Sequence, residues 1–436
     1  MGLFIEKDRT LEVEIERLLP GGVGLAHAEG LTLFVSLAAP GDAVRIRIDR
    51  IQGKLGFASI VEVLKPSPVR IEPPCPYFGR CGGCDFQQLT YEAQLDAKIR
   101  IIQDCLHRIA KIEPSPAIPM NASSNQWRYR TRANWQVESV SKLLGYFERG
   151  SNRVCDVEYC AVLVPELQQT LEKVRNEIRA ETTASHLKDI DVVAGDEGVS
   201  LAPPLRDFKT TIVSHRVGNE TYYFSAEAFF QVNHELLEPL IVEALRDAKG
   251  QTAVDLYCGV GLFTLPLARR FEQVTAIESH PKATEFARLN IESAKRGGRS
   301  IPAYAAGQLG WNGTVRNGGE TWVGTASLGD VQLVTARVGD WLEGHSRPSW
   351  PVDFLLLDPP RTGCENRDIA GILALHPARI AYVSCDPATL SRDLKKLIAG
   401  GYTLDSVVAF DMFPQTHHVE TVAHLRSTNS RISGAA

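Results

Sequence analysis

The pattern of hydrophobic and polar positions changes twice along the chain and so divides it into three regions. In the first, residues 1–65, apolar and polar positions alternate over residues 11–15 and 44–48, and glycines separate such stretches. Alternation is typical of half-buried strands, and glycine-rich pairs are typical of turns. We predict a small β-barrel with Arg45 and Arg47 on its outer face. These arginines form either an ordinary solvated surface or a stripe that contacts phosphates.

The second region, residues 66–225, is predicted to be a central α+β domain. It opens with prolines and cysteines, after which apolar residues recur at steps of three and four over residues 91–109. That period predicts a helix. Arginines then alternate with aromatic residues over 127–132. Such a stretch suits either the binding of single-stranded RNA or an edge strand with one charged face.

The third region, residues 226–436, alternates short apolar runs with helical patterns. The apolar runs are 253–257, 274–277, 354–357 and 380–383. Runs of this kind predict buried parallel strands with helices between them, which is a Rossmann-like α/β domain. Residues 297–334 are rich in Gly, Thr and Asn and interrupt the pattern. We interpret them as an insertion or long loop, with room for a hairpin of its own.

Composition limits the class of protein. The chain has 436 residues, 44% of them hydrophobic, and a net charge of -5. Any polyanionic partner must therefore bind to local basic patches. No apolar run approaches the length of a membrane span, and the acidic N-terminus is unlike a signal peptide. We expect a cytoplasmic protein without a membrane partner, in which the nine cysteines serve metal binding or catalysis.

A cofactor site is predicted at the strand ends of the third region. The sequence Asp-Leu-Tyr-Cys-Gly-Val-Gly at 255–261 follows a strand and precedes a helix. Acidic residues follow the next strands: Glu278, then Asp340 after a strand expected at 331–338, then Asp358. Ligands bind at such strand ends in doubly wound sheets. Because the full G-x-G-x-x-G of dinucleotide sites is absent, the set favours S-adenosylmethionine.

A thiol and a carboxylate are the candidate catalytic groups. Cys385 follows the strand at 380–383, and we expect the helix beginning at Pro387 to lower the pKa of its thiol. Glu420 lies in the polar stretch 413–420. The alternatives are a buried structural cysteine and an ordinary surface charge.

The motifs at 255–261, 358–361 (Asp-Pro-Pro-Arg), 384–387 (Ser-Cys-Asp-Pro) and 417–420 (His-His-Val-Glu) resemble the RNA (uracil-5)-methyltransferase family over essentially the whole chain. The bacterial 23S rRNA branch is most similar, since residues 1–65 resemble its TRAM barrel. The resemblance implies S-adenosylmethionine-dependent methylation of uridine carbon 5 in 23S rRNA by a monomer. The alternatives are the same chemistry on tRNA and a non-catalytic RNA-binding assembly factor.

The resemblance also implies residue roles. Cys385 is then the nucleophile that adds to carbon 6 of uracil, and Glu420 is the base that removes the proton from carbon 5. Asp358 is expected to lie near the target base as well as the cofactor. The implied cofactor contacts are Gln231, Tyr257, Glu278, Asp340 and Asp358.

The cysteine cluster is a separate candidate site. Cys75, Cys81 and Cys84 lie within one Pro/Gly-rich stretch, and Cys155 or Cys160 could supply a fourth ligand. Four thiolates suit a [4Fe–4S] cluster or a structural zinc ion, and the spacing leaves both open. The family resemblance favours [4Fe–4S] with Cys160 as the fourth ligand, and so a central domain that contains an iron–sulfur site.

Overall fold

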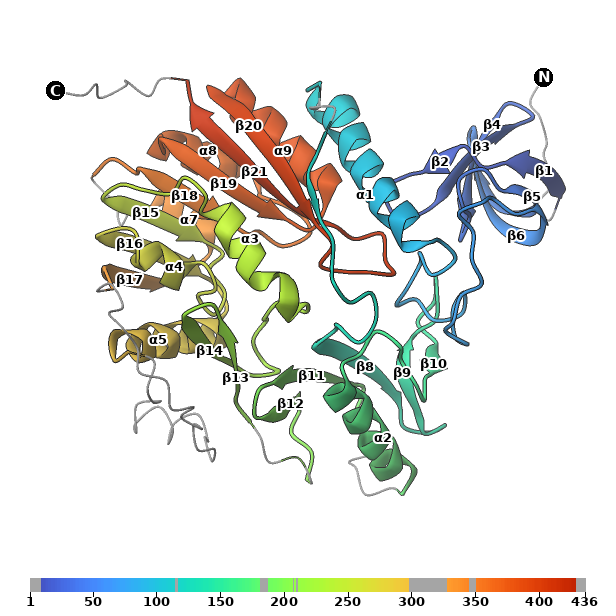
Figure 1. Cartoon of the computed structure of the whole chain (residues 1–436), viewed down its shortest axis with the longest axis horizontal. Coiled ribbons are helices and arrows are strands. Elements are labelled where there is room, and N and C mark those ends of the chain that lie inside the picture. The colour runs from blue at the N-terminus through green and yellow to red at the C-terminus, as the bar shows by residue number, and fades with distance from the viewer. Residues whose placement is uncertain are drawn as a thin grey trace.

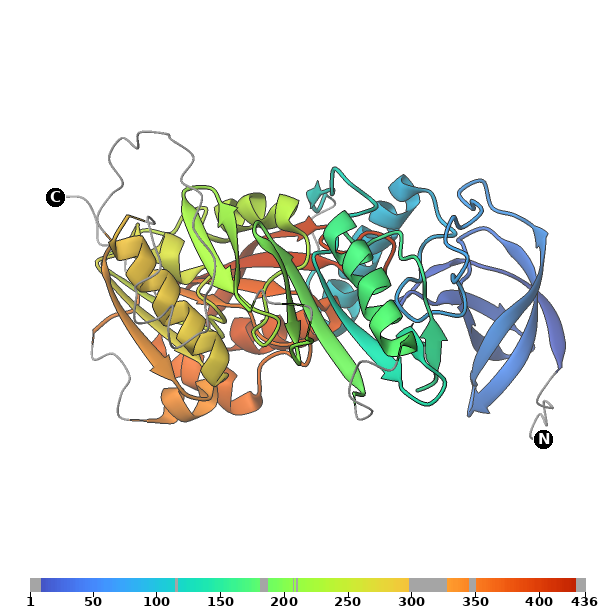
Figure 2. The ribbon, with the colours of Figure 1, turned by 90° about the horizontal axis from the view of Figure 1, so that it is seen from below.

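The computed structural model describes residues 9–113, 117–180, 187–206, 208, 211–297, 328–344 and 350–428. An N-terminal barrel and a large mixed sheet lie at opposite ends of the molecule, with the central region between them (Figures 1 and 2). The barrel is a curled six-stranded sheet in the order β1-β5-β6-β4-β3-β2. Its strands are β1 (Thr10–Glu14), β2 (Arg17–Leu18), β3 (Gly24–Ala28), β4 (Leu31–Ser36), β5 (Ala43–Gln52) and β6 (Leu55–Lys65).

The alternation in β5 separates the two faces of the barrel as predicted. Val44, Ile46 and Ile48 are buried in the barrel core. Arg45 and Arg47 point outward, where Arg45 pairs with glutamates on β1 and β6 and Arg47 pairs with Asp49. Because acidic neighbours neutralise both arginines, the structure favours the ordinary solvated surface over a phosphate-binding stripe.

The predicted helix of the second region forms, and it packs against the third region. Helix α1 (Tyr91–Cys105) continues into one π-helical turn, η1 (Leu106–Ala110). Thr90 begins the helix, because its hydroxyl accepts a hydrogen bond from the Ala93 amide. The helix contacts α9, and the short strand β7 (Met120–Asn121) then joins the large sheet beside β20. Part of the second region therefore packs on the large sheet of the third region and adds an edge strand to it.

The rest of the central region is a small sheet covered by one helix. The strand order is β10-β9-β8-β11-β12, and helix α2 (Pro165–Arg179) packs on it (Figure 1). A hairpin, β13 (Val213–Val217) and β14 (Glu220–Phe224), leads into the third region. The strands of the small sheet are β8 (Arg132–Glu138), β9 (Leu143–Phe147), β10 (Val154–Asp156), β11 (Asp189–Gly195) and β12 (Gly198–Ala202).

The third region is a three-layer α/β domain. Its eight-stranded sheet has the order β17-β16-β15-β18-β19-β21-β20-β7. The first five strands are parallel, and β21 is antiparallel to both β19 and β20. The strands are β15 (Thr252–Leu256), β16 (Gln273–Glu278), β17 (Asp330–Thr335), β18 (Phe354–Leu357), β19 (Arg379–Ser384), β20 (Tyr402–Phe410) and β21 (Glu420–Ser427).

Helices cover both faces of this sheet. Turn η2 (His234–Leu236) leads into the helices of one face, which are α3 (Leu237–Ala244), α4 (Thr264–Ala268) and α5 (Pro281–Lys295). The other face carries α1 with α7 (Val338–Glu343), α8 (Asn366–Leu375) and α9 (Pro387–Ala399). The four apolar runs became four adjacent buried strands, so the Rossmann-like prediction is confirmed.

Two details differ from the expectations. The strand expected at 331–338 is β17, Asp330–Thr335, and Val338 instead begins helix α7. Of the expected insertion at 297–334, residues 298–327 lie outside the described residues. None of the helices that the structure describes is both long and apolar enough to span a membrane.

Candidate active site and cysteine cavity

The candidate cofactor site lies where β15 and β18, two adjacent parallel strands of the large sheet, end. Helices leave the sheet on opposite faces here, which is the place where such sheets bind ligands. The loop after β15 has left-handed backbone at three alternate positions, with φ of 63° at Tyr257, 56° at Gly259 and 92° at Gly261. The two glycines adopt this conformation without strain, whereas Tyr257 is held in it, which is common at ligand-binding loops.

Hydrogen bonds to Glu278 join the ends of β15 and β16. Its carboxylate accepts from the Gly259 amide at 3.0 Å and from the His280 amide at 2.7 Å. These bonds fix the carboxylate at the crevice edge, where an acid can accept hydrogen bonds from ribose hydroxyls. The Tyr257 hydroxyl donates to Asp368 of α8 at 2.8 Å, so the tyrosine ring links the loop to the opposite wall.

Asp340 occupies a different setting from the other acidic residues. It lies in the first turn of α7, and its side chain is 57% exposed and paired with Arg367 at 2.6 Å. The carboxylate therefore faces solvent at the outer rim of the crevice. Binding of an adenine amine there would require it to share or exchange the Arg367 contact.

The sheet register brings Cys385, Glu420 and Asp358 together. The β19–β21 ladder ends with Ser384 opposite Thr421, so the next antiparallel pair is Cys385 and Glu420. Asp358 follows β18, which adjoins β19 on its other side. Glu420 is only 1% exposed, and its Oε1 has no hydrogen-bond partner among the described residues. A buried carboxylate oxygen left without a partner is costly and is typical of a site that awaits a ligand.

The electrostatics of this trio contradict the expectation for the thiol. Burial and the carboxylates of Glu420 and Asp358 raise the pKa of Cys385 to about 12, and nearby Arg361 offsets only part of this. The pKa of Cys385 is therefore raised, not lowered as we expected from the α9 N-terminus, and the carboxylate of Asp386, which caps that helix by accepting from the Thr389 amide, adds to the rise. Burial and the charge of Asp358 also raise the pKa of Glu420.

Gln231 completes the wall beside Asp358. The side chain is buried, and its hydrogen bond to Asp358 opposes the effect of burial, which raises the pKa of that carboxyl. The loop that carries Gln231 is held by Arg132, which donates to the carbonyls of Ala226 and Ala228, both at 2.7 Å. The structure thus places Gln231, Asp358, Cys385 and Glu420 in one site.

Two residues of the site were not singled out from the sequence. Asp255 is fully buried at the end of β15, where it accepts from the Thr264 hydroxyl at 2.6 Å, and burial raises its pKa to about 7. Arg361 is the cation whose positive charge lowers the pKa of Cys385. Both lie inside motifs already recognised, at 255–261 and 358–361, so their position within those motifs was the available signal.

The stretch 127–132 turns mostly inward, which departs from both readings of its alternation. The buried Tyr129 hydroxyl donates to the Pro414 carbonyl at 2.9 Å, and Arg130 lines a cavity with several cysteines. Trp127 and Arg128 remain at the surface, where they line an open pocket with residues 124–126. Arg128 has a φ of 55°, so its backbone is strained where its guanidinium reaches solvent.

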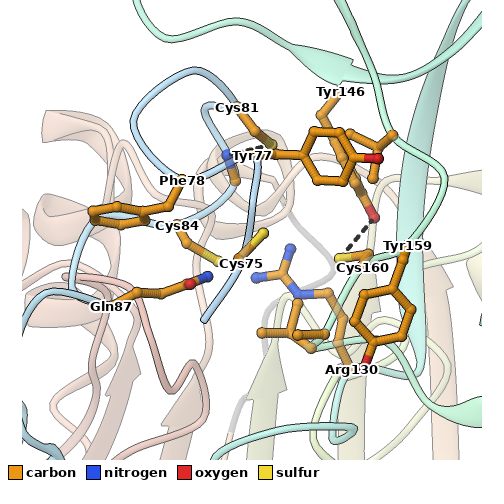
Figure 3. A pocket seen from close by; sticks show the side chains of 14 residues that line it. Cys75, Tyr77, Phe78, Cys81, Cys84, Gln87, Arg130, Tyr146, Tyr159 and Cys160 are labelled. Carbon is orange, nitrogen blue, oxygen red and sulfur yellow. Dashed lines mark hydrogen bonds between the residues drawn. The ribbon is translucent and has the colours of Figure 1, made fainter. Parts of the chain in front are cut away.

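Four cysteines line a single small cavity of about 30 Å³. Cys75, Cys81 and Cys84 come from the loop that precedes α1, and Cys160 comes from the loop after β10 (Figure 3). Burial raises the pKa of Cys81 and of Cys84 to about 12, and the other thiols add to this. Free thiolates are therefore disfavoured here unless positive charge binds among them.

Cys155 does not line this cavity. It is buried on β10, where its sulfur accepts a hydrogen bond from Arg80 at 3.2 Å. Among the described residues, no three His, Cys, Asp or Glu side chains converge where a single metal ion would sit. The four cysteines instead line one small cavity, with the Arg130 guanidinium directed toward them (Figure 3).

Comparison with known proteins defines the class. A family model described as tRNA (Uracil-5-)-methyltransferase matches residues 206–306 and 333–428, and a TRAM domain model matches residues 6–61. An uncharacterized RNA methyltransferase of Halalkalibacterium halodurans is 29% identical, covering 98% of each chain. The protein is an RNA methyltransferase with an N-terminal TRAM domain.

A named relative gives the family. The 23S rRNA (uracil(1939)-C(5))-methyltransferase RlmD of Alkalilimnicola ehrlichii is 32% identical, covering 94% of this chain and 95% of its own. The fold is that of the Pyrococcus abyssi tRNA (uracil-54, C5)-methyltransferase in complex with S-adenosyl-L-homocysteine, with a TM-score of 0.69 at 22% identity over 95% of this chain and 100% of that one. The chain belongs to the RNA (uracil-5)-methyltransferase family and is an S-adenosylmethionine-dependent enzyme that methylates uracil carbon 5 in RNA.

Proposed function

We propose that this enzyme methylates a uridine of 23S rRNA through a covalent adduct between Cys385 and carbon 6 of the base. The observation that carries the mechanism is the meeting of Asp358, Cys385 and Glu420 at three adjacent strand ends. The 32% identical relative named for 23S rRNA spans nearly the whole chain, including the cysteine region, and this supports the ribosomal substrate. The Pyrococcus abyssi neighbour acts on tRNA by its name, which keeps tRNA as the second candidate.

The residues suggest a sequence of bond changes. The Cys385 thiolate adds to carbon 6, which makes carbon 5 an enolate carbon that takes the methyl group from the sulfonium of S-adenosylmethionine. Glu420 then accepts the carbon-5 proton, and the carbon 6–sulfur bond breaks to release thiolate and product. Because the thiol is protonated in the free site, it must first lose its proton to a nearby base when substrate binds. Asp358, beside it, is placed for that transfer.

The remaining site residues hold the cofactor in this proposal. Glu278, fixed by two amides, accepts from the ribose, and Tyr257 packs at the turn beside it. Asp340 contacts adenine at the exposed edge of the site, where its carboxylate divides its hydrogen bonds between adenine and Arg367. Gln231 orients Asp358 and reaches the target uracil.

We propose that the cysteine cavity holds a [4Fe–4S] cluster through Cys75, Cys81, Cys84 and Cys160. Four thiolates around a volume, rather than four that meet at a point, support a cluster over a zinc ion. The cluster with its thiolates carries net negative charge, and Arg130 would offset part of it. Anaerobic purification followed by metal analysis tests this, since zinc in place of iron would contradict it.

We propose that RNA lies across three functional parts: the barrel at 1–65, the central region at 66–225 and the methyltransferase domain at 226–436. Trp127 and Arg128 offer a stacking surface and a cation for nucleotides beside the target. We propose that the enzyme acts as a monomer. We propose a cytoplasmic location, as expected for an enzyme that acts on ribosomal RNA.

The substrate is tested by mass mapping of 5-methyluridine in RNA from a deletion strain. We expect one or more 23S rRNA fragments to lose the modification while tRNA keeps it. Loss from tRNA alone would identify tRNA as the substrate. Unchanged RNA of both kinds, with a purified protein that binds RNA without methylating it, would favour the assembly factor.

A further inference from the structure

The segment that leads into Glu420 is held by parts of the chain outside the methyltransferase domain. We name residues 411–418, between β20 and Glu420, the approach segment. Its first six residues are buried, although it forms no strand or helix. Glu420 Oε1 has no hydrogen-bond partner among the described residues, so the position of this carboxylate depends on the backbone that carries it. The approach segment is one of the two backbone connections that fix it.

Helix α1 anchors the beginning of the approach segment. Lys98 forms an ion pair with Asp411 in which both side chains are fully buried, and its ammonium also donates to the Phe413 carbonyl at 3.0 Å. The Tyr91 hydroxyl donates to the other oxygen of Asp411 at 2.8 Å. Anchoring of this kind has a stringent geometry, because a buried ion pair is stable only when its partners are well placed.

The cysteine loop anchors the end of the approach segment. The amides of Asp85 and Phe86, directly after Cys84, both donate to the Gln415 carbonyl, at 3.1 and 3.0 Å. The Asp85 carboxylate accepts from the His417 amide at 2.8 Å and lies 2.5 Å from the His417 ring nitrogen Nδ1. Gln415 has a φ of 69°, and Gln94 holds it with two reciprocal hydrogen bonds of 3.0 Å.

The barrel closes the same junction. Gly22, in a turn with a φ of 74°, lies so close to His417 that an added Cβ would come within 3.0 Å of the His417 Cβ and 3.2 Å of the Asp85 carboxylate. Asp85 and His417 are therefore enclosed by the barrel turn, the cysteine loop and the approach segment. Three residues after His417 comes Glu420.

We propose that Asp85 is a positioning residue that ties the cysteine loop to the approach segment and thereby sets the Glu420 carboxylate over carbon 5 of the bound uracil. The inference rests on the proposed function, in which Glu420 removes the carbon-5 proton. Displacing Glu420 leaves methyl transfer intact and slows only the step after it. The methylated covalent adduct between Cys385 and RNA then accumulates, because it cannot lose its carbon-5 proton.

The test is the amount of adduct formed with radiolabelled methyl donor and substrate RNA, measured on denaturing gels in a single turnover. The variants are Asp85→Ala, Asp85→Asn and Glu420→Gln, with Asp96→Asn, an exposed aspartate of α1, as matched control. For Asp85→Ala we expect kcat to fall by about 10- to 100-fold, the loss that a misplacement near 1 Å causes, with KM little changed. Labelled adduct should rise toward the Glu420→Gln amount, while Asp85→Asn, which can still accept from the His417 amide, restores much of the turnover.

The proposal and the proposed function can fail separately. If Glu420→Gln accumulates labelled adduct but Asp85→Ala does not, Asp85 has no positioning role and the mechanism stands. If neither wild type nor Glu420→Gln forms any adduct while RNA is methylated, the covalent mechanism itself fails. Should Asp85→Ala not fold, as judged by thermal melting and metal content, Asp85→Ser replaces it, because the shorter side chain withdraws the carboxylate from both the amide and the ring of His417, and adduct accumulation in that variant decides the matter in the same way.

Discussion

The active site and the cysteine cavity are built in opposite ways. Asp358, Cys385 and Glu420 stand at the ends of neighbouring strands in one sheet, so the strand register alone brings them together. The four cavity cysteines come from two loops with no strand pairing between the ligand positions. A site at strand ends is rigid before ligand binds, whereas a site made of loops depends on what it binds to keep its shape. The two are joined through Asp85 and His417.

The largest expected effect is at the nucleophile. Cys385→Ala should lower methylation on the order of 10⁴-fold or more, because no neighbouring group replaces the thiol. Cys155→Ala, a buried cysteine of β10 in the small sheet, is the matched control and should retain turnover. The measurement is transfer of labelled methyl to RNA. Substantial turnover by Cys385→Ala would show that the strand-end site is not where the chemistry occurs.

The cysteine cavity is best tested by a pair of neighbouring cysteines. Cys160→Ser removes a residue that lines the cavity, and iron should fall from about four atoms per chain toward none. Cys155 lies outside the cavity, where its sulfur accepts a hydrogen bond from Arg80, so Cys155→Ser should leave the iron content unchanged. Iron analysis and the visible absorption of anaerobically purified protein read this out. The reverse pattern would make Cys155 the fourth ligand.

The buried ion pair between the two sites should matter mainly for stability. Lys98→Met leaves Asp411 buried without its cation, which costs about 3–5 kcal/mol of unfolding free energy. Denaturant unfolding measures this, with Lys396→Met, a half-buried partner of Asp393 on α9, as control. A loss below about 1 kcal/mol, typical of surface pairs, would show that Asp411 finds another partner.

The pH dependence of kcat/KM shows whether Arg361 acts through its charge on Cys385 or through a contact with RNA. Its positive charge lowers the pKa of Cys385, which burial and two carboxylates raise to about 12. Arg361→Ala raises that pKa further, so less thiolate forms at pH 7, and kcat/KM should fall by about 3- to 10-fold there. Because the thiolate fraction grows with pH until the pKa is reached, the rate of either protein should rise with pH through this range. Arg361→Lys keeps the charge and should retain most of the rate, and loss in both variants would indicate a contact with RNA instead.

The smallest effect compares two surface arginines. Arg128→Ala should weaken RNA binding and reduce the salt dependence of the affinity by about one unit of slope, as expected for one phosphate contact. Arg45→Ala should change neither, because Glu12 and Glu62 already neutralise it. Titration of RNA fragments at several salt concentrations gives both slopes. If only Arg45→Ala weakened binding, we would infer that the RNA lies on the outer face of the barrel and not beside Arg128.

Much of the catalytic domain could be predicted from the sequence because its strands are short apolar runs followed directly by chemical groups. Glu278, Asp358 and Cys385 follow from that rule. The elevated pKa of Cys385 could not be predicted, since it depends on Asp358 and Glu420, which are distant in sequence and meet only through the sheet. The link between Asp85 and His417 spans 332 positions of sequence and lies in loops, where no periodicity marks it.

The stretch 127–132 illustrates a different limit. Its alternation of arginine and aromatic residues suggested an exposed surface. Tyr129 is instead buried against the Pro414 carbonyl, and Arg130 lines the cysteine cavity. Arg132 holds the loop that carries Gln231. The composition of a short segment does not show which of its side chains point inward when they bond to loop carbonyls instead of to a neighbouring strand. The Cys75–Cys84 triplet, in contrast, could be singled out by its close spacing, and the structure places its three cysteines with Cys160 around one cavity.

The central claim, a covalent bond between Cys385 and carbon 6 of uracil, is tested most directly with substrate RNA that contains 5-fluorouridine. Fluorine cannot leave carbon 5 as a proton, so the reaction stops after methyl transfer with enzyme and RNA joined. We predict a methylated adduct that survives denaturation, maps to the peptide containing Cys385 and is absent from Cys385→Ala. Failure of the wild type to form it while methylating ordinary RNA, or an adduct that persists in Cys385→Ala, would contradict the account.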